Sequence, residues 1–272
     1  MTAASPYSRM HPGASRPVRI AHAFGNSRRR LARALEGPVD LIETDVWFED
    51  GRIVVRHERK LGRLPILFDK KPESAGERGP GRFGISLGKW YIKLDTSVLP
   101  LREVMAKSKG RRGLLLDLKG AYGGKEEAFA GALVELVAST GMEHEVAFCG
   151  QNWRLLKWVR RLAPHLAVHY SIDNAAQLAA FRRMREGDPI RRICVRHSLL
   201  DESLAHGLQA LGVTTVYTWT VDDLRRAQEL LELGVDGIIS NSLKLLELLG
   251  PGADAHLQPG ADPPMAEAEG LP

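Results

Sequence analysis

The sequence predicts a parallel (β/α)₈ TIM barrel with an insertion after the second strand. Short apolar runs alternate with longer amphipathic segments from residue 18 to residue 249, which is the rhythm of repeated strand-helix units. The length of 272 residues suits this fold, because barrels of roughly 250 residues form one domain. One glycine- and proline-rich stretch interrupts the alternation and is the predicted insertion.

The predicted elements follow from the apolar spacing. One helix shows the reasoning: Leu224, Ala227 and Leu230 recur at helical spacing, and Gly234 is placed to end the helix. We expect strands at residues 18–22, 41–46, 114–118, 146–149, 166–170, 193–195, 215–219 and 237–240. We expect helices at residues 27–35, 125–139, 153–162, 175–185, 201–211, 221–233 and 243–249.

The barrel domain is predicted to span residues 17–249. Residues 1–16 mix Ser, Pro, Gly, Arg and His without periodicity, and residues 250–272 repeat Pro, Gly, Ala and acidic residues, so we expect disordered tails there. The insertion covers about residues 58–100 and contains the aromatic pair Trp90 and Tyr91. Because structureless loops of that length are uncommon unless functional, we interpret it as a lid over the active-site face. The alternative is a tolerated surface excursion.

Composition and charge limit the class of function. The hydrophobic share of 44% is ordinary for a globular protein, and the formal charge of +5 favours anionic partners. The arginine runs at 28–30, 111–112 and 182–183 fall in separate elements, so no continuous nucleic-acid surface is expected. No apolar run reaches the roughly 18 residues of a membrane span, and no signal segment is present. We therefore expect a cytoplasmic protein without a transmembrane segment. The oligomeric state is left open.

Acidic residues close two neighbouring predicted strands, where barrel enzymes place their active sites. Glu43 and Asp45 are separated by one residue and so share a strand face, and Asp117 closes the next strand of the prediction. Three carboxylate oxygens suit one divalent cation, Mg²⁺ or Ca²⁺. The alternative is that these acids pair with a lysine or arginine of the barrel.

Two histidines flank this acidic group in the sequence. His22 closes the first strand and His57 follows the second. One imidazole can take a proton from an attacking group while the other gives one to a leaving oxygen, and a hard cation polarises a phosphoryl oxygen. This combination indicates phosphodiester chemistry. The alternative is a structural role for the histidines, and the order along the chain does not decide which would be the acid.

Further strand-end residues are candidates for substrate contact. Lys119 shares a face with Asp117 and offers a positive charge to phosphate oxygens, or else neutralises the acids. Trp219 offers a wall for an apolar group, with barrel packing as the alternative. His169 and Arg196 also lie near strand ends and are equally compatible with capping or surface roles.

Six segments of the chain, taken together, resemble the glycerophosphodiester phosphodiesterase family. They are residues 20–22, 42–46, 50–57, 116–119, 217–222 and 234–240. The resemblance implies a metal-dependent barrel hydrolase that splits glycerophosphodiesters into glycerol phosphate and an alcohol. By position, His22 and His57 match its acid-base pair. The metal ligands are matched by Glu43, Asp45 and Asp117, and the phosphate-contacting lysine by Lys119.

Departures from that family concern the substrate more than the fold. Ala23 stands where the family carries an arginine, and we expect Arg56 or Arg196 to replace its charge; Asn26 matches the asparagine of the following loop. Some departures resemble sphingomyelinase D-like phospholipases, which implies a lysophospholipid substrate and intramolecular attack as the alternative. A barrel that binds phosphorylated ligands without turnover is a further alternative, which Ala23 favours.

Overall fold

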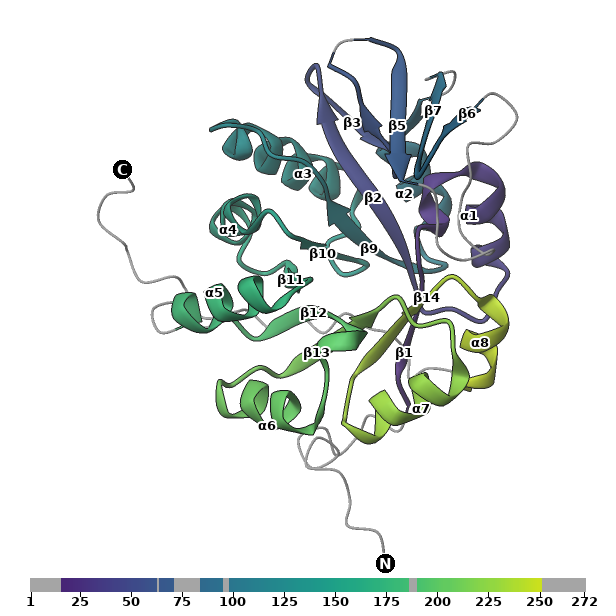
Figure 1. The fold of residues 1–272 in the computed structure, drawn as a ribbon. Coiled ribbons are helices and arrows are strands. Elements are labelled where there is room, and N and C mark those ends of the chain that lie inside the picture. Colours follow the sequence, from purple (N-terminus) through teal and green to yellow (C-terminus); the bar gives the residue numbers. More distant parts are fainter. Residues whose placement is uncertain (1–15, 63, 71–83, 95–97, 186–189, 251–272) are drawn as a thin grey trace, which may run out of the picture.

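The computed structural model describes residues 16–62, 64–70, 84–94, 98–185 and 190–250. Within these ranges eight parallel strands form a closed ring, because β1 pairs with β2 on one side and with β14 on the other (Figure 1). The predicted TIM barrel is therefore confirmed. The ring consists of β1 (Val18–Ala21), β2 (Leu41–Glu49), β9 (Gly113–Leu118), β10 (Val146–Gly150), β11 (Ala167–Ile172), β12 (Arg192–Arg196), β13 (Thr215–Trp219) and β14 (Gly237–Ser240).

Eight α-helices of the described chain surround the ring (Figure 1). Six of them begin after a residue whose side-chain oxygen accepts a hydrogen bond from the backbone N–H three positions later; these caps are Ser27, Asn152, Asn174, Asp201, Asp223 and Ser242. The helices are α1 (Arg28–Leu35), α2 (Leu101–Ser108), α3 (Glu126–Thr140), α4 (Trp153–Leu162), α5 (Ala175–Arg185), α6 (Glu202–Ala210), α7 (Leu224–Glu232) and α8 (Leu243–Leu248). Short 3₁₀ turns lie at Phe24–Asn26 and His197–Leu199.

Helix α2 is absent from the sequence prediction. Its buried side chains, Leu101, Val104, Met105 and Ser108, recur at helical spacing. The segment is only eight residues long and directly follows the insertion, so its periodic signal covers barely two turns. This helix covers the outside of the barrel beside β9 and completes the ring of helices.

The core has two layers, one inside the ring and one between the ring and the helices. On β9, Leu115 belongs to the inner cluster, whereas Leu114 and Leu116 belong to the outer one. Cys149 and Cys194 are free thiols buried in the inner cluster. A hydrogen bond to Cys194, together with burial, raises the pKa of Cys149 well above its ordinary value, which suits an unreactive core thiol.

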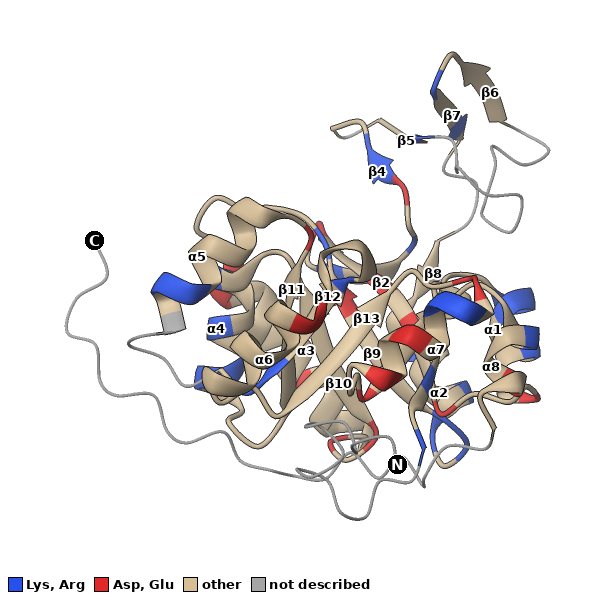
Figure 2. Cartoon of the chain, turned by 60° about the horizontal axis from the view of Figure 1, so that its bottom comes forward, with Lys and Arg blue, Asp and Glu red and all other residues tan. Residues whose placement is uncertain are grey.

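The insertion follows the second barrel strand, as predicted, and builds a small sheet of its own. Strand β3 (Arg52–Val55) returns antiparallel along β2, and β8 (Leu99–Pro100) pairs with β3. Between them lies a four-stranded antiparallel sheet, which we call the insertion sheet; it projects from the barrel in Figures 1 and 2. Its order is β4 (Arg59–Lys60), β5 (Ile66–Lys70), β7 (Trp90–Leu94) and β6 (Gly84–Leu87). The lid role of the insertion stays a prediction.

Some predictions concern residues or properties that the structure does not address. The predicted tails lie outside the described residues except for Arg16 and Gly250. Among the described helices, none is both long enough and apolar enough to cross a membrane. The cytoplasmic location and the absence of a nucleic-acid partner stay predictions.

Candidate active site

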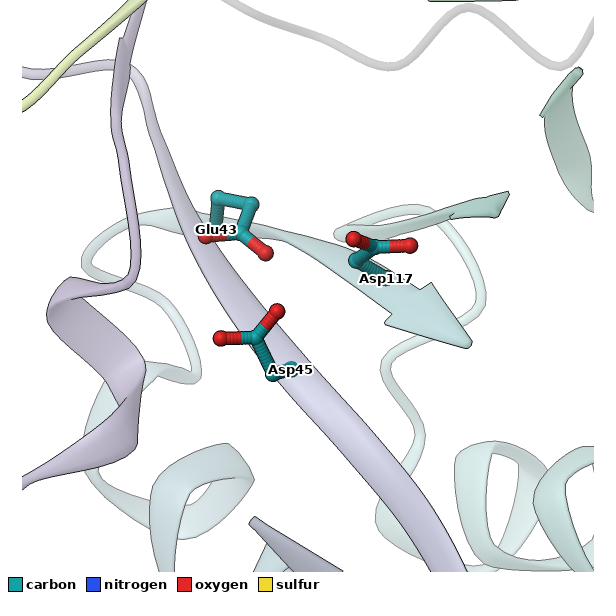
Figure 3. A group of neighbouring side chains, drawn as sticks. All are labelled: Glu43, Asp45 and Asp117. Carbon is teal, nitrogen blue, oxygen red and sulfur yellow. The ribbon is translucent and has the colours of Figure 1, made fainter. Parts of the chain in front are cut away.

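Three carboxylates converge at one end of the barrel. Glu43 and Asp45 project from the same face of β2, and Asp117 lies beside Asp45 because the two residues are register partners in the pair β2–β9. One oxygen from each carboxylate lies within 4.8 Å of the others (Figure 3). Strand alternation and parallel register therefore bring together the three acids that the sequence singled out.

The donor set fits a hard divalent cation. Glu43 is 3% and Asp45 0% exposed. Among the described residues, Glu43 Oε1 has no hydrogen-bond partner; Asp45 Oδ1 has no hydrogen bond either, although Lys119 Nζ lies 2.9 Å away. Buried carboxylate oxygens without a donor are costly unless a cation compensates them, and an all-oxygen set is what Mg²⁺ or Ca²⁺ requires.

Lys119 is the cation that the structure itself places among these acids. Its Nζ lies 2.9 Å from Asp45 Oδ1 and also forms an ion pair with Asp117. Burial alone would lower the pKa of Lys119, but the charges of Asp117, Asp45 and Glu43 raise it well above its ordinary value. The alternative foreseen from the sequence, that a lysine pairs with the acids, is thus present in the structure. One lysine leaves a group of three carboxylates incompletely neutralised.

The surroundings shift the pKa values of the three acids in different directions. Burial, followed by the charges of Asp45 and Asp117, raises the pKa of Glu43 well above its ordinary value. Burial also acts to raise the pKa of Asp45, but the charges of Lys119 and His57 outweigh it and lower the value. Burial raises the pKa of Asp117 as well, against the charge of Lys119, so Glu43 and Asp117 are the acids whose burial is not fully compensated.

The turn after β1 donates hydrogen bonds to the carboxylates of β2. The backbone N–H of Ala23 donates to Glu43 Oε2, and the Asn26 side-chain amide donates to Asp45 Oδ2. Asn26 Oδ1 in turn accepts from the backbone N–H of Asp45 at 2.8 Å. A Cβ on Gly25 would lie 1.8 Å from Thr44 Oγ1, so only glycine permits this approach. The sequence predicted which carboxylates form the group, and the structure shows that the turn after β1 orients two of them.

His22 directly follows β1, and its Nδ1 lies 3.0 Å from Asn241 Oδ1. Asn241 is fixed by Asp222, which accepts from its backbone N–H at 2.8 Å and from its Nδ2 at 2.9 Å. Since the amide nitrogen donates to Asp222, the amide oxygen faces His22 and accepts from Nδ1–H. This arrangement leaves the lone pair on Nε2. Burial lowers the pKa of His22 to about 4, so the ring is neutral at pH 7.

His57 has a different kind of partner. Its Nδ1 contacts Asp69 Oδ2, a carboxylate on β5 of the insertion sheet. Burial alone would lower the pKa of His57, but the charge of Asp45 and the hydrogen bond to Asp69 raise it. The charges of Asp45 and Lys119 act on both histidines, so the two rings belong to one electrostatic site. One ring is paired with an amide, and the other with a carboxylate.

The remaining predicted substrate contacts are spread over two environments. Arg196 pairs with Asp173, and its guanidinium lies 5.1 Å above the Trp219 ring, where β12 and β13 end. Arg56 is buried and donates to Glu49 and to the Glu58 carbonyl.

His169 lies deeper, inside the barrel. It is stacked on Tyr217 with ring centroids 4.5 Å apart. Burial, together with the charge of Arg192, lowers its pKa to about 3. Arg196 and Trp219 therefore adjoin at the strand ends, whereas Arg56 and His169 are enclosed. A substrate contact by any of these residues stays a prediction.

Sequence reasoning missed the residues that hold the histidines. Asn241 directly follows β14, so the strand-end rule that selected His22 also applied to it. Asp69 gave no such signal, because its contact with His57 depends on how the insertion folds. Arg30 was also missed; its Nη2 donates to the His22 carbonyl at 3.2 Å, and its guanidinium lies 4.2 Å above the Phe24 ring.

Known proteins are similar to this chain along most of its length. Glycerophosphodiester phosphodiesterase GDPD4 of Arabidopsis thaliana is 25% identical over 230 residues, which are 83% of this chain and 69% of the relative. The structure of an Oleispira antarctica phosphodiesterase in complex with the product sn-glycerol-3-phosphate matches with a TM-score of 0.65 and 19% identity, over 86% of this chain and 96% of that one. A glycerophosphodiester phosphodiesterase structure from Parabacteroides distasonis matches with a TM-score of 0.63 and 19% identity, over 85% and 96%.

These structural matches support the fold, and the family follows from the sequence. The sequence model described as the glycerophosphoryl diester phosphodiesterase family matches residues 11–245, a range that contains the whole carboxylate group and both histidines. The chain belongs to the glycerophosphoryl diester phosphodiesterase family.

Proposed function

We propose that this protein hydrolyses glycerophosphodiesters to a glycerol phosphate and an alcohol, with a divalent cation and the two histidines as its catalytic groups. The observation that carries this proposal is the pairing of two imidazoles with unlike partners beside one carboxylate group. Family membership supports the substrate class, and the Oleispira antarctica relative holds sn-glycerol-3-phosphate as product.

Glu43, Asp45 and Asp117 would hold the cation, Mg²⁺ or Ca²⁺. Glu43 Oε1, which has no hydrogen-bond partner among the described residues, supports this assignment. When bound, the ion polarises a non-bridging phosphate oxygen and offsets the charge that develops on it. Lys119 offers a second positive charge to the same phosphate, because its Nζ already lies between Asp45 and Asp117.

His22 is proposed as the general base. With Nδ1–H directed at Asn241, its Nε2 lone pair accepts a proton from the attacking water as the water oxygen bonds to phosphorus. The Asn241–Asp222 pair holds the ring in the tautomer that this step needs. After the step His22 releases this proton to solvent, and His57 takes one up from solvent, so both rings return to their starting protonation states.

His57 is proposed as the general acid. The Asp69 carboxylate stabilises the charged imidazolium, which keeps a proton on Nε2 for the departing alkoxide. As the bond from phosphorus to the leaving oxygen breaks, that oxygen takes the proton and leaves as an alcohol. The products are a phosphate monoester and an alcohol, so the atoms of one water molecule are divided between them.

Arg196 and Trp219 are proposed to contact the leaving group. Their adjoining side chains present a cation and an aromatic surface at the ends of neighbouring strands. Arg30 is our candidate for the charge that Ala23 does not provide, because its guanidinium reaches the His22 backbone. Each of these roles can be tested by a single substitution of the residue concerned, which leaves the carboxylate group intact.

The test is a substrate panel with the purified full chain. Glycerophosphocholine, lysophosphatidylcholine and bis(p-nitrophenyl) phosphate are each incubated with Mg²⁺ or Ca²⁺, and products are identified by mass spectrometry. Release of glycerol phosphate from glycerophosphocholine supports the proposal. A cyclic phosphate from lysophosphatidylcholine alone would instead favour the intramolecular phospholipase, and no product from any substrate despite bound metal would favour the non-catalytic binder.

A further inference from the structure

The two faces of the insertion sheet differ sharply in chemistry. Cross-strand register places Phe68, Ile92 and Ile85 in one row, and Lys70, Trp90 and Leu87 in the next row of the same face. Phe68 and Trp90 contact each other with ring centroids 6.4 Å apart, and Lys70 Nζ lies 5.7 Å from the Trp90 ring centroid. We call this the outer face, because the alternate residues of each strand point to the barrel.

Several side chains of the inner face contact the barrel side of the molecule. Tyr91 is buried and its hydroxyl donates to Glu58 Oε1 at 3.1 Å. Asp69 contacts His57, and Lys60 Nζ lies 3.8 Å from Glu49. These contacts fix which face of the sheet is turned away from the barrel.

The outer face leaves large apolar side chains in solvent. Ile85 is 66%, Leu87 54% and Leu94 57% exposed, and Trp90 is 38% exposed. In the described part of the chain, nine large hydrophobic residues are exposed, and seven of them lie between residues 61 and 98. Single exposed apolar residues are ordinary, but a cluster on one sheet face marks an interaction surface.

Positive charge accompanies this apolar cluster. The described residues of the insertion sheet and its turns, 59–62, 64–70 and 84–94, contain five Lys or Arg and one Asp. Lys60 and Lys93 pair with Glu49 and Glu58 on the inner face, which leaves Arg59, Lys70 and Lys89 beside the apolar cluster. Figure 2 shows blue segments on β4, β5 and β7. The one acid, Asp69, is turned to the inner face. Apolar side chains next to lysines are the combination that inserts into a lipid surface carrying anionic head groups.

We propose that the outer face of the insertion sheet docks this protein on an anionic lipid surface. Ile85, Leu87 and Trp90 enter the head-group region, while Lys70 and Lys89 meet the lipid phosphates. Charge complementarity selects this occupant over a second copy of the chain, because two equally cationic faces would repel one another. The proposal goes beyond the hydrolytic function and does not depend on turnover.

The test measures binding of the full chain to vesicles without any substrate. Sedimentation is compared for vesicles of phosphatidylcholine with phosphatidylglycerol and for vesicles of phosphatidylcholine alone. The double variant Ile85→Ser, Leu87→Ser should lose at least about tenfold in partitioning to the anionic vesicles. The matched control is Leu162→Ser, Leu248→Ser, which removes two exposed leucines of 43% and 60% exposure from barrel helices and should bind like the wild type.

A charge variant separates the contribution of the basic side chains to vesicle binding from that of the apolar side chains. Lys89→Glu should weaken binding to anionic vesicles by roughly fivefold or more, because each basic residue near such a surface adds about that factor. Lys244→Glu, an exposed lysine on α8, is the control and should change binding little. Circular dichroism and hydrolysis of glycerophosphocholine check that each variant is folded, so a failure of the proposed function is recognised separately.

Two outcomes would overturn the proposal. One is equal sedimentation of wild type with both kinds of vesicle or with neither. The other is a wild-type dimer in light scattering that Ile85→Ser, Leu87→Ser converts to a monomer while vesicle binding is absent; the face would then join two copies of the chain.

Discussion

The imidazole of His57 contacts the carboxylate of Asp69, although the two residues belong to different sheets. His57 follows the barrel hairpin β2–β3, whereas Asp69 lies on β5 of the insertion sheet. The contact joins a proposed proton donor to a segment that the eight-stranded ring does not require. The chemistry of the site is therefore tied to how the insertion folds.

Replacing Asp69 should shift the pH dependence of hydrolysis. The charge and hydrogen bond of Asp69 raise the pKa of His57, so Asp69→Asn lowers that pKa. If protonated His57 is the acid, the alkaline limb of the kcat profile then moves to lower pH. The control is Asp50→Asn in the exposed β2–β3 turn. An unshifted alkaline limb in Asp69→Asn would show that His57 does not act as the acid.

Removal of either histidine should slow turnover without unfolding the protein. General acid-base catalysis contributes about 10²- to 10⁴-fold per group, so His22→Ala and His57→Ala should each lower kcat by about that factor. His206→Ala, at an exposed position on α6, should leave kcat unchanged. Thermal melting by circular dichroism verifies the fold, and full metal-dependent activity in the double histidine variant would refute the mechanism.

Asn241 contacts His22, and if it orients the proposed base, its loss should affect rate more than binding. Asn241→Ala removes the acceptor of His22 Nδ1–H, which frees the ring to adopt the other tautomer. Substitution of a residue that orients a catalytic group typically costs about 10- to 100-fold. We expect kcat for glycerophosphocholine to fall by that factor while KM stays near the wild-type value. A change confined to KM would place Asn241 in substrate binding instead.

Glu43→Gln should separate metal binding from stability. Burial and the neighbouring acids raise the pKa of Glu43. Since a raised carboxyl pKa means that ionisation opposes folding at neutral pH, the neutral glutamine should keep or increase the Tm without metal. Saturating Mg²⁺ or Ca²⁺ at about 100 times Kd stabilises the native state by about 2.7 kcal/mol. The wild-type Tm should rise by several degrees, whereas the variant should show no such rise. A clear drop in metal-free Tm would contradict this account.

His169 should make stability depend on pH below neutrality. Its pKa is lowered from 6.5 to about 3, so the unfolded chain binds a proton that the native state excludes between these values. Stability is thus complete above pH 6.5 and falls by roughly 1.4 kcal/mol per pH unit as the pH drops toward 3. His169→Gln should flatten this slope in urea unfolding series. Parallel slopes for wild type and variant would show that His169 does not titrate in this way.

The barrel and the carboxylate group could be predicted because their signals are local. Alternation placed Glu43 and Asp45 on one face, and the neighbouring strand supplied Asp117. Helix α2 was missed because its eight residues give too short a periodic pattern. A pattern repeated over many residues was therefore predicted correctly, whereas one confined to two helical turns was not.

The partners of the histidines depend on contacts between distant segments. Asn241 and His22 are 219 positions apart, and no pattern within either segment indicates the other. The contact of Asp69 with His57 required the register of the insertion sheet. The enclosed position of His169 followed from layering inside the ring, since a residue near a strand end can still lie below the mouth.

The pairing of His22 with Asn241 bears on when the protein becomes active during its synthesis. His22 is synthesised before its hydrogen-bond acceptor, which comes just after the final barrel strand, and the residue that fixes this acceptor precedes that strand. A nascent chain that ends before Asn241 thus carries the proposed base without the residue that orients it. We expect hydrolysis to reach its full rate only once β14 has paired with β1, which closes the ring and brings Asn241 to His22.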